Sequence, residues 1–170
     1  MSRKMLDVLA VGKEIFVGLE DSKRNWRICV KTNGYVFHET NMPTDYSNLQ
    51  SFFKRFVDCK IRLVYEAGFK GFTLYDKLVS DGVDCVVLPP HLLAEAKGAK
   101  VKTDKRDAKS LARMAEQKDC PACHVPDKER REDRQICRTL NAIEKEIKST
   151  RNRIRKLLQM HGIEVSSPMT

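Results

Sequence analysis

The segment from residue 61 to residue 88 constrains the fold more than any other part of the chain. It contains an apolar strand pattern over 61–66, apolar residues at helical spacing over 72–79, and a second apolar strand pattern over 83–88. A strand, a helix and a strand of these lengths form a crossover, which places the two strands parallel in one sheet. The chain is therefore predicted to contain an α/β core.

The residues before this crossover predict three antiparallel strands. The runs 15–21 and 26–31 have strand patterns, and Asn33 followed by Gly34 is a strong hairpin signal that introduces a third strand over 35–40. A helix follows whose large apolar residues recur at helical spacing and are expected in the core: Tyr46, Leu49, Phe52, Phe53 and Phe56. The predicted fold class is α/β, with a mixed sheet of three antiparallel strands and then parallel strands, and helices on both faces.

The composition indicates a globular protein with an anionic partner. The 170 residues are 41% hydrophobic and 32% charged, and 32 Lys and Arg against 23 Asp and Glu give a net charge of +9. Such an excess of cations favours nucleic acid as a partner. No apolar run approaches the roughly 18–20 residues of a membrane span, and the N-terminus has no signal-peptide pattern. We expect a cytoplasmic protein with no membrane partner and with reduced cysteines.

A candidate site for metal and phosphate lies between residues 100 and 112. Asp104 and Asp107 are three residues apart, so they share one face of a predicted helix and could bind the same hard cation. The cations around them suit the backbone of a polyanion: Lys100, Lys102, Lys105, Arg106 and Lys109. The alternative interpretation is a solvated helix start stabilised by surface ion pairs.

Two predicted strands end in carboxylates. Glu20 and Asp21 end the first strand, and Glu66 ends the first parallel strand. In a mixed α/β sheet the ends of neighbouring strands meet at one edge, where these acids could join the two aspartates. Four carboxylates there could hold two Mg²⁺ ions for in-line displacement at a phosphodiester. Because successive strand residues face opposite sides, Glu20 and Asp21 cannot both contribute without a bulge.

The character of the chain changes beyond Gln117, where a linker leads into a long helix that begins near Asp127. Gly162 stands where a glycine commonly ends a helix. Residues on one face of this helix alternate by four and three, which is a heptad seam: Ile136, Leu140, Ile143, Ile147, Thr150, Ile154, Leu157 and His161. Its outer face is basic and is a candidate nucleic-acid contact: Lys148, Arg151, Arg153, Arg155 and Lys156. The seam needs a partner helix, so either the chain dimerises or the partner follows Thr170.

The linker contains Cys120, Cys123 and His124, which together spell the c-type haem attachment motif. Haem attachment requires export, for which the sequence has no signal. A zinc site that also uses Cys137 or His161 lacks a second paired ligand motif. A plain linker is the preferred interpretation.

Several motifs together resemble the DEDD transposases of bacterial insertion sequences, the family that includes the pilin-gene invertase. They lie at residues 16–23, 26–30, 64–68, 71–76, 87–90 and 102–108, and the last is the most specific. The resemblance implies a RuvC-like, RNase H-type domain whose four acids bind divalent metal, two Mg²⁺ ions with Mn²⁺ as a substitute, for DNA cleavage and joining. Carried over by position, the acids are Glu20, Glu66, Asp104 and Asp107. The family usually has aspartate at the first position, so Glu20 is a departure, preferred over Asp21 by alignment.

The resemblance also implies a domain organisation and a set of partners. The expected parts are a catalytic domain over 1–118, a linker over 119–126, a long basic coiled-coil helix over 127–162 and a tail over 163–170. Family members continue into a domain with a nucleophilic serine, so the chain is expected to be a truncated product or a fragment. Some members are guided by a structured RNA, which the basic loop over 97–109 and the basic helix face would bind.

Three functions follow as expectations. The first is metal-dependent DNA cleavage and strand transfer by a transposase that also forms a homo-oligomer through its coiled coil. The second is a non-catalytic protein that binds DNA, guide RNA or the full-length transposase. The third is a stand-alone nuclease for four-way DNA junctions.

Overall fold

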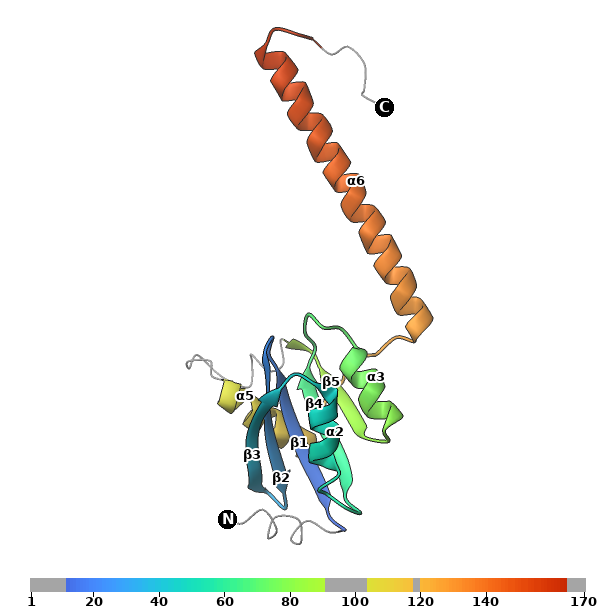
Figure 1. Ribbon diagram of the computed structural model, residues 1–170. Coiled ribbons are helices and arrows are strands. Elements are labelled where there is room, and N and C mark those ends of the chain that lie inside the picture. Colours follow the sequence, from blue (N-terminus) through green and yellow to red (C-terminus); the bar gives the residue numbers. More distant parts are fainter. Residues whose placement is uncertain (1–11, 91–103, 118–119, 165–170) are drawn as a thin grey trace. The chain divides into compact units, whose positions relative to one another are not determined.

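The computed structural model describes residues 12–90, 104–117 and 120–164, and within these the side chains of residues 104–106 are left undescribed. The chain divides into two compact units, Met1–Val125 and Pro126–Thr170. The first unit contains a five-stranded sheet in the order β3-β2-β1-β4-β5 (Figure 1). The second contains one long helix.

The sheet is mixed, as predicted. Strands β1 (Glu14–Asp21), β2 (Asn25–Thr32) and β3 (Tyr35–Pro43) form an antiparallel meander. Strand β4 (Lys60–Glu66) pairs parallel with β1, and β5 (Asp84–Leu88) pairs parallel with β4. The turn between β2 and β3 has φ of 50° at Asn33 and 81° at Gly34. Two positive φ values in a two-residue loop match the strand twist, which is why this dipeptide predicts the hairpin.

Helices cover both faces of the sheet (Figure 1). Helices α2 (Tyr46–Phe53) and α3 (Thr73–Ser80) pack on one face, where the odd-numbered residues of β1 point. Helix α5 (Asp104–Glu116) packs on the other face against β1, β2 and β4. The fully buried side chains of the first face come from both strands and helices, among them Ile15, Val17, Leu19, Ile28, Leu49, Leu63 and Leu78. The prediction of a two-sided α/β core is therefore confirmed.

The aromatic stripe after β3 is core, although the helix is shorter than its spacing suggests. Helix α2 begins after the N-cap Asp45, whose side chain accepts a hydrogen bond from the Ser47 amide, and it ends at Phe53. Phe56 lies beyond the helix and is nevertheless only 6% exposed, with its ring 5.2 Å from that of Phe52. The turn that follows, rather than another helical turn, thus delivers Phe56 to the core.

Helix α6 (Lys128–Met160) makes up most of the second unit. The Asp127 side chain caps it by accepting a hydrogen bond from the Arg130 amide at 2.8 Å, and Gly162, with φ of 74°, follows its C-cap. No residue of this helix is buried. The long helix is confirmed, and its coiled-coil pairing stays a prediction. No helix in the described part of the chain has the length and apolar character that crossing a bilayer requires.

Candidate functional site

Strand β1 separates the two acids at its end onto opposite faces. Because strand residues alternate, Asp21 shares a face with the buried Leu19, whereas Glu20 shares a face with Gly18. The Asp21 carboxylate accepts a 2.6 Å hydrogen bond from Nε1 of Trp26 and pairs with Nζ of Lys70 at 2.5 Å. Its side chain is only 6% exposed. Asp21 is thereby held by Trp26 and Lys70 on the face of the sheet that also carries the main core.

Glu66 lies beside Glu20 at the same edge of the sheet. In the parallel pairing of β1 with β4, Leu19 is opposite Tyr65, so the next residue of each strand is a glutamate. Val64 packs under Leu111 of α5, and Glu66, two residues further along, belongs to the same face. The structure thus brings the two strand-end glutamates to one face at one edge.

Helix α5 approaches β1 so closely that only glycine fits beneath it. A Cβ atom on Gly18 would lie 2.1 Å from the carbonyl oxygen of Ala108 and 2.2 Å from the amide nitrogen of Ala112. Asp107 precedes Ala108 and is itself only 2% exposed. Its Oδ1 atom and the Oε2 atom of Glu20 are both buried.

The far end of α5 is held at the opposite edge of the sheet, which fixes the direction of the helix. Glu116 forms an ion pair with Lys31 of β2, and its Oε1 atom accepts a 2.7 Å hydrogen bond from the amide of Gly34. The hydrogen bond from Lys31 lowers the pKa of the Glu116 carboxyl. With Glu116 near the β2–β3 turn, the N-terminal residues of α5 lie toward the edge where β1 and β4 end. Asp107 therefore lies at the same end of the sheet as Glu20 and Glu66.

The remaining predicted site residues are described only in part. Asp104 begins α5, one turn before Ala108, but its side chain lies outside the described residues. The same holds for the side chains of Lys105 and Arg106, and all of Lys100 and Lys102 lies outside them. Lys109 is described and forms a 3.3 Å ion pair with Glu39 of β3. On α6 the predicted cations are exposed at Lys148, Arg151, Arg153 and Lys156, and Arg155 is half-buried.

The acids fit a divalent cation by the chemistry of their donors, because carboxylate oxygens are the ligands that Mg²⁺ prefers. Within the described residues, however, no group of three or more His, Cys, Asp or Glu side chains gathers closely enough to hold an ion. Glu20, Glu66 and Asp107 share a face and an edge, and the side chain of Asp104 lies outside this count.

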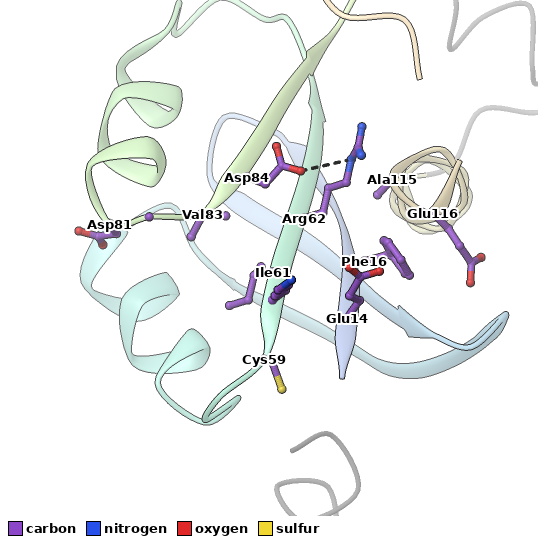
Figure 2. A pocket seen from close by; sticks show the side chains of 12 residues that line it. Glu14, Phe16, Cys59, Ile61, Arg62, Asp81, Val83, Asp84, Ala115 and Glu116 are labelled. Carbon is purple, nitrogen blue, oxygen red and sulfur yellow. Dashed lines mark ion pairs between the residues drawn. The ribbon is translucent and has the colours of Figure 1, made fainter. Parts of the chain in front are cut away.

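A separate pocket opens at the other end of the sheet (Figure 2). Its volume is about 520 Å³, and it lies between the beginnings of β1 and β4 and the end of α5. Arg62 and Asp84 form a 3.6 Å ion pair in its wall. It is remote from Glu20 and Glu66, which end the strands whose beginnings line it. No motif in the sequence indicated this pocket, since its lining residues are scattered over four segments of the chain.

The cysteines of the predicted linker, Cys120 and Cys123, belong to the first compact unit. The Cys123 amide donates a 2.7 Å hydrogen bond to the carbonyl oxygen of Val87, and Cys123 and Val125 contact the main core. Burial raises the pKa of the Cys120 thiol. Cys120, Cys123 and Cys137 are all free thiols.

Sequence reasoning did not find Lys70 as a partner of Asp21. Lys70 lies in the irregular segment between β4 and α3, which has no periodicity from which its direction could be read. Its ammonium group also lies 5.8 Å from the centre of the Trp26 ring.

Comparison with known proteins identifies the class to which this chain belongs. A model of the DEDD transposases of IS110 type, described as "Transposase", matches residues 17–163. The chain belongs to this family.

Individual relatives carry related names. "Putative transposase y4qE" of Sinorhizobium fredii (strain NBRC 101917 / NGR234) is 30% identical over 156 residues, which are 88% of this chain and 40% of that protein. "Transposase for insertion sequence element IS1533" of Leptospira borgpetersenii is 32% identical over 106 residues, 60% of this chain and 31% of that protein. "Putative transposase y4rJ" of S. fredii is 26% identical over 174 residues, 91% of this chain and 44% of that protein. The chain thus spans less than half the length of each of these relatives.

Proposed function

We propose that the first unit is an RNase H-like, RuvC-type catalytic domain that cleaves and joins DNA strands during transposition of an insertion sequence. The observation that carries this proposal is the placement of Glu20, Glu66 and Asp107 on one face at one edge of the sheet. Adjacent parallel strands hold the two glutamates on a rigid scaffold, and the contact at Gly18 holds α5 above them. The strand order with β1 in the centre is consistent with such a domain.

In this proposal Glu20, Glu66, Asp104 and Asp107 hold divalent cations, Mg²⁺ or Mn²⁺. When bound, two such ions would supply electrostatic stabilisation of the attacking and leaving oxygens of a phosphodiester. The sheet and α5 keep the carboxylates in place before substrate arrives, so that little reorganisation accompanies the reaction. Asp21 has no part in metal binding, because its carboxylate is engaged by Trp26 and Lys70 on the other face.

The cations near the acids would bind the phosphate backbone. A structured guide RNA or DNA would lie against the five cations that surround Asp104 and Asp107 in the sequence: Lys100, Lys102, Lys105, Arg106 and Lys109. The basic residues of α6 offer a second backbone contact. A cytoplasmic location belongs to the same proposal.

Two variants with a matched control test the metal site. We expect Glu20→Gln and the double variant Asp104→Asn plus Asp107→Asn to weaken Mn²⁺ binding, measured by calorimetry, by at least the roughly tenfold that loss of an outer-shell partner costs. Glu14→Gln is the control, since Glu14 begins the same strand and is exposed at the far end. When the same substitutions are made in a full-length transposase, recombination should depend on the same residues. If Mg²⁺-dependent DNA binding or recombination is unchanged in the double aspartate variant, the proposal is wrong.

A second candidate function is assembly without catalysis. It is favoured by the exposed apolar side chains of α6, which suit self-association or association with a full-length transposase. The chain would then bind DNA, guide RNA or another transposase subunit and perform no chemistry. Cleavage of DNA in Mg²⁺ by the 170-residue chain alone would rule this candidate out.

A further inference from the structure

Helix α6 carries an apolar stripe along one face, and the side chains of this stripe are exposed. The large apolar members of the heptad seam are between 43% and 59% exposed: Ile136, Leu140, Ile143, Ile147, Ile154 and Leu157. A long stripe of exposed isoleucine and leucine along one helix face is typical of a surface that binds a second helix.

We propose that this stripe binds the same stripe of a second copy of the chain, with the two helices antiparallel and Ile147 of each opposite Thr150 of the other. The proposal rests on the self-association suggested above and is independent of the carboxylate chemistry. It fixes the orientation and the register of the pair.

The first argument is that the seam is symmetric about its centre. Reversing one helix about the point between Ile147 and Thr150 places Ile143 opposite Ile154 and Leu140 opposite Leu157. Every layer of an antiparallel pair joins an a position to a d position, and here the alternating spacing gives such layers along the whole seam. The two ends are closed by Ile136 opposite His161, which is the C-cap. A second copy satisfies this spacing in every layer, because a two-fold interface presents the same patch twice.

The second argument is the charge beside the seam. Glu144 and Glu146 flank its first half, and Arg151 and Arg153 flank its second half. In the antiparallel pair, Glu144 faces Arg151 and Glu146 faces Arg153, and the two-fold axis repeats both contacts. In a parallel pair, only Glu146 faces Arg151, because g residues then meet the e residues of the following heptad. None of the four forms an ion pair with another described residue.

The third argument is Asp133, which falls on the next seam position before Ile136. A parallel pair would place the two Asp133 carboxylates opposite each other within the seam, where like charges repel. In the antiparallel pair Asp133 falls opposite residues beyond Met160, where the partner helix has ended, so its carboxylate stays in water. Arg151 and Arg153 then serve the interface, which leaves Lys148, Arg155 and Lys156 for a nucleic acid.

Disulfide trapping of the 170-residue chain tests the orientation, in a Cys137→Ser background that removes the exposed thiol of this helix. Chains carrying Leu140→Cys are mixed with differently tagged chains carrying Leu157→Cys, and oxidised. The expected result is a disulfide between residues 140 and 157 of different chains, identified by peptide mapping. A dominant disulfide between two 140 positions, formed by Leu140→Cys alone, would show a parallel pair and overturn the proposal.

Charge exchange gives a second, independent readout by sedimentation equilibrium. Glu144→Arg alone should raise the dimer dissociation constant about tenfold, since two attractive contacts become repulsive. Adding Arg151→Glu should restore the constant to within about threefold in the antiparallel pair, because the exchanged charges at positions 144 and 151 then attract each other again. In a parallel pair, Glu146 would instead face the new carboxylate at position 151, and binding would weaken further.

The dimer and the proposed function can fail separately. A monomer at all concentrations would overturn the dimer while leaving Mn²⁺ binding by the first unit unaffected. Loss of metal binding with the antiparallel pair intact would instead overturn only the proposed function.

Discussion

Substitution of Gly18 by alanine should push helix α5 away from the sheet and destabilise the fold. The added methyl group would lie 2.1 Å from the Ala108 carbonyl oxygen and 2.2 Å from the Ala112 amide nitrogen. Carbon and oxygen atoms in close contact are normally about 3.3 Å or more apart, so the helix would have to move by roughly 1 Å. Both contacts are to backbone atoms, which no side-chain rotation can relieve. We therefore expect a loss near the upper end of the overpacking range, about 3 kcal/mol in the free energy of unfolding.

The measurement is urea unfolding followed by circular dichroism, with the melting temperature as a second readout. A loss of about 3 kcal/mol corresponds to a fall of roughly 6–12 °C in a chain of this size. Gly68→Ala is the matched control, since a Cβ there would meet one atom, the Glu66 carbonyl oxygen, at an ordinary 3.8 Å. If Gly18→Ala unfolds at the same urea concentration as the control, the close packing of α5 on β1 is wrong.

Displacement of α5 should also weaken metal binding by Gly18→Ala, because Asp107 precedes the residue that the methyl group strikes. The loss of Mn²⁺ affinity should persist at low temperature, where the variant is fully folded. Unchanged affinity in the folded variant would mean that α5 does not carry metal ligands.

Three further predictions concern groups whose environments the structure defines. The hydrogen bond from Lys31 lowers the pKa of Glu116 below its ordinary 4.5, so its stabilisation is present above that pH and is lost as the pH falls through the lowered value. Glu116→Gln should thus lower the unfolding free energy by about 1–2 kcal/mol at pH 7. In urea unfolding repeated at acidic pH, where Glu116 is protonated, the difference between the variant and the wild type should vanish. Asp21→Asn should lower the unfolding free energy by about 1–3 kcal/mol while leaving calorimetric Mn²⁺ binding unchanged, and weakened binding would contradict its structural role. Exposed Cys137 should react with iodoacetamide well before Cys29. Burial raises the pKa of the Cys29 thiol to about 11, so only about one Cys29 side chain in a thousand is a thiolate at pH 8. Mass mapping of the first alkylated peptide shows which of the two cysteines reacted first.

Much of the fold could be predicted because its signals are local. Alternation and apolar runs gave the strands, Asn33 and Gly34 gave the hairpin, and the spacing over 61–88 gave the parallel crossover. The end of α2 could not be predicted in the same way, because Phe56 keeps the helical spacing of Phe52 while reaching the core from a turn.

For the candidate site as well, local signals could be predicted from the sequence and long-range contacts could not. The sequence indicated that Glu20, Glu66, Asp104 and Asp107 are the acids to consider, and family resemblance supported that choice. It could not determine which of Glu20 and Asp21 faces α5, because a one-residue shift exchanges the two faces of a strand. Asp21 was placed by Trp26 across a strand pair and by Lys70 in a distant loop.

By itself, then, the sequence determined the elements, their order and the candidate residues for a metal and phosphate site, since periodicity and side-chain chemistry act over a few neighbouring residues. Only the tertiary structure decided which of those residues share an edge. That outcome depends on the register of β1 with β4 and on the approach of α5 to Gly18, and both join segments more than 40 residues apart in the chain.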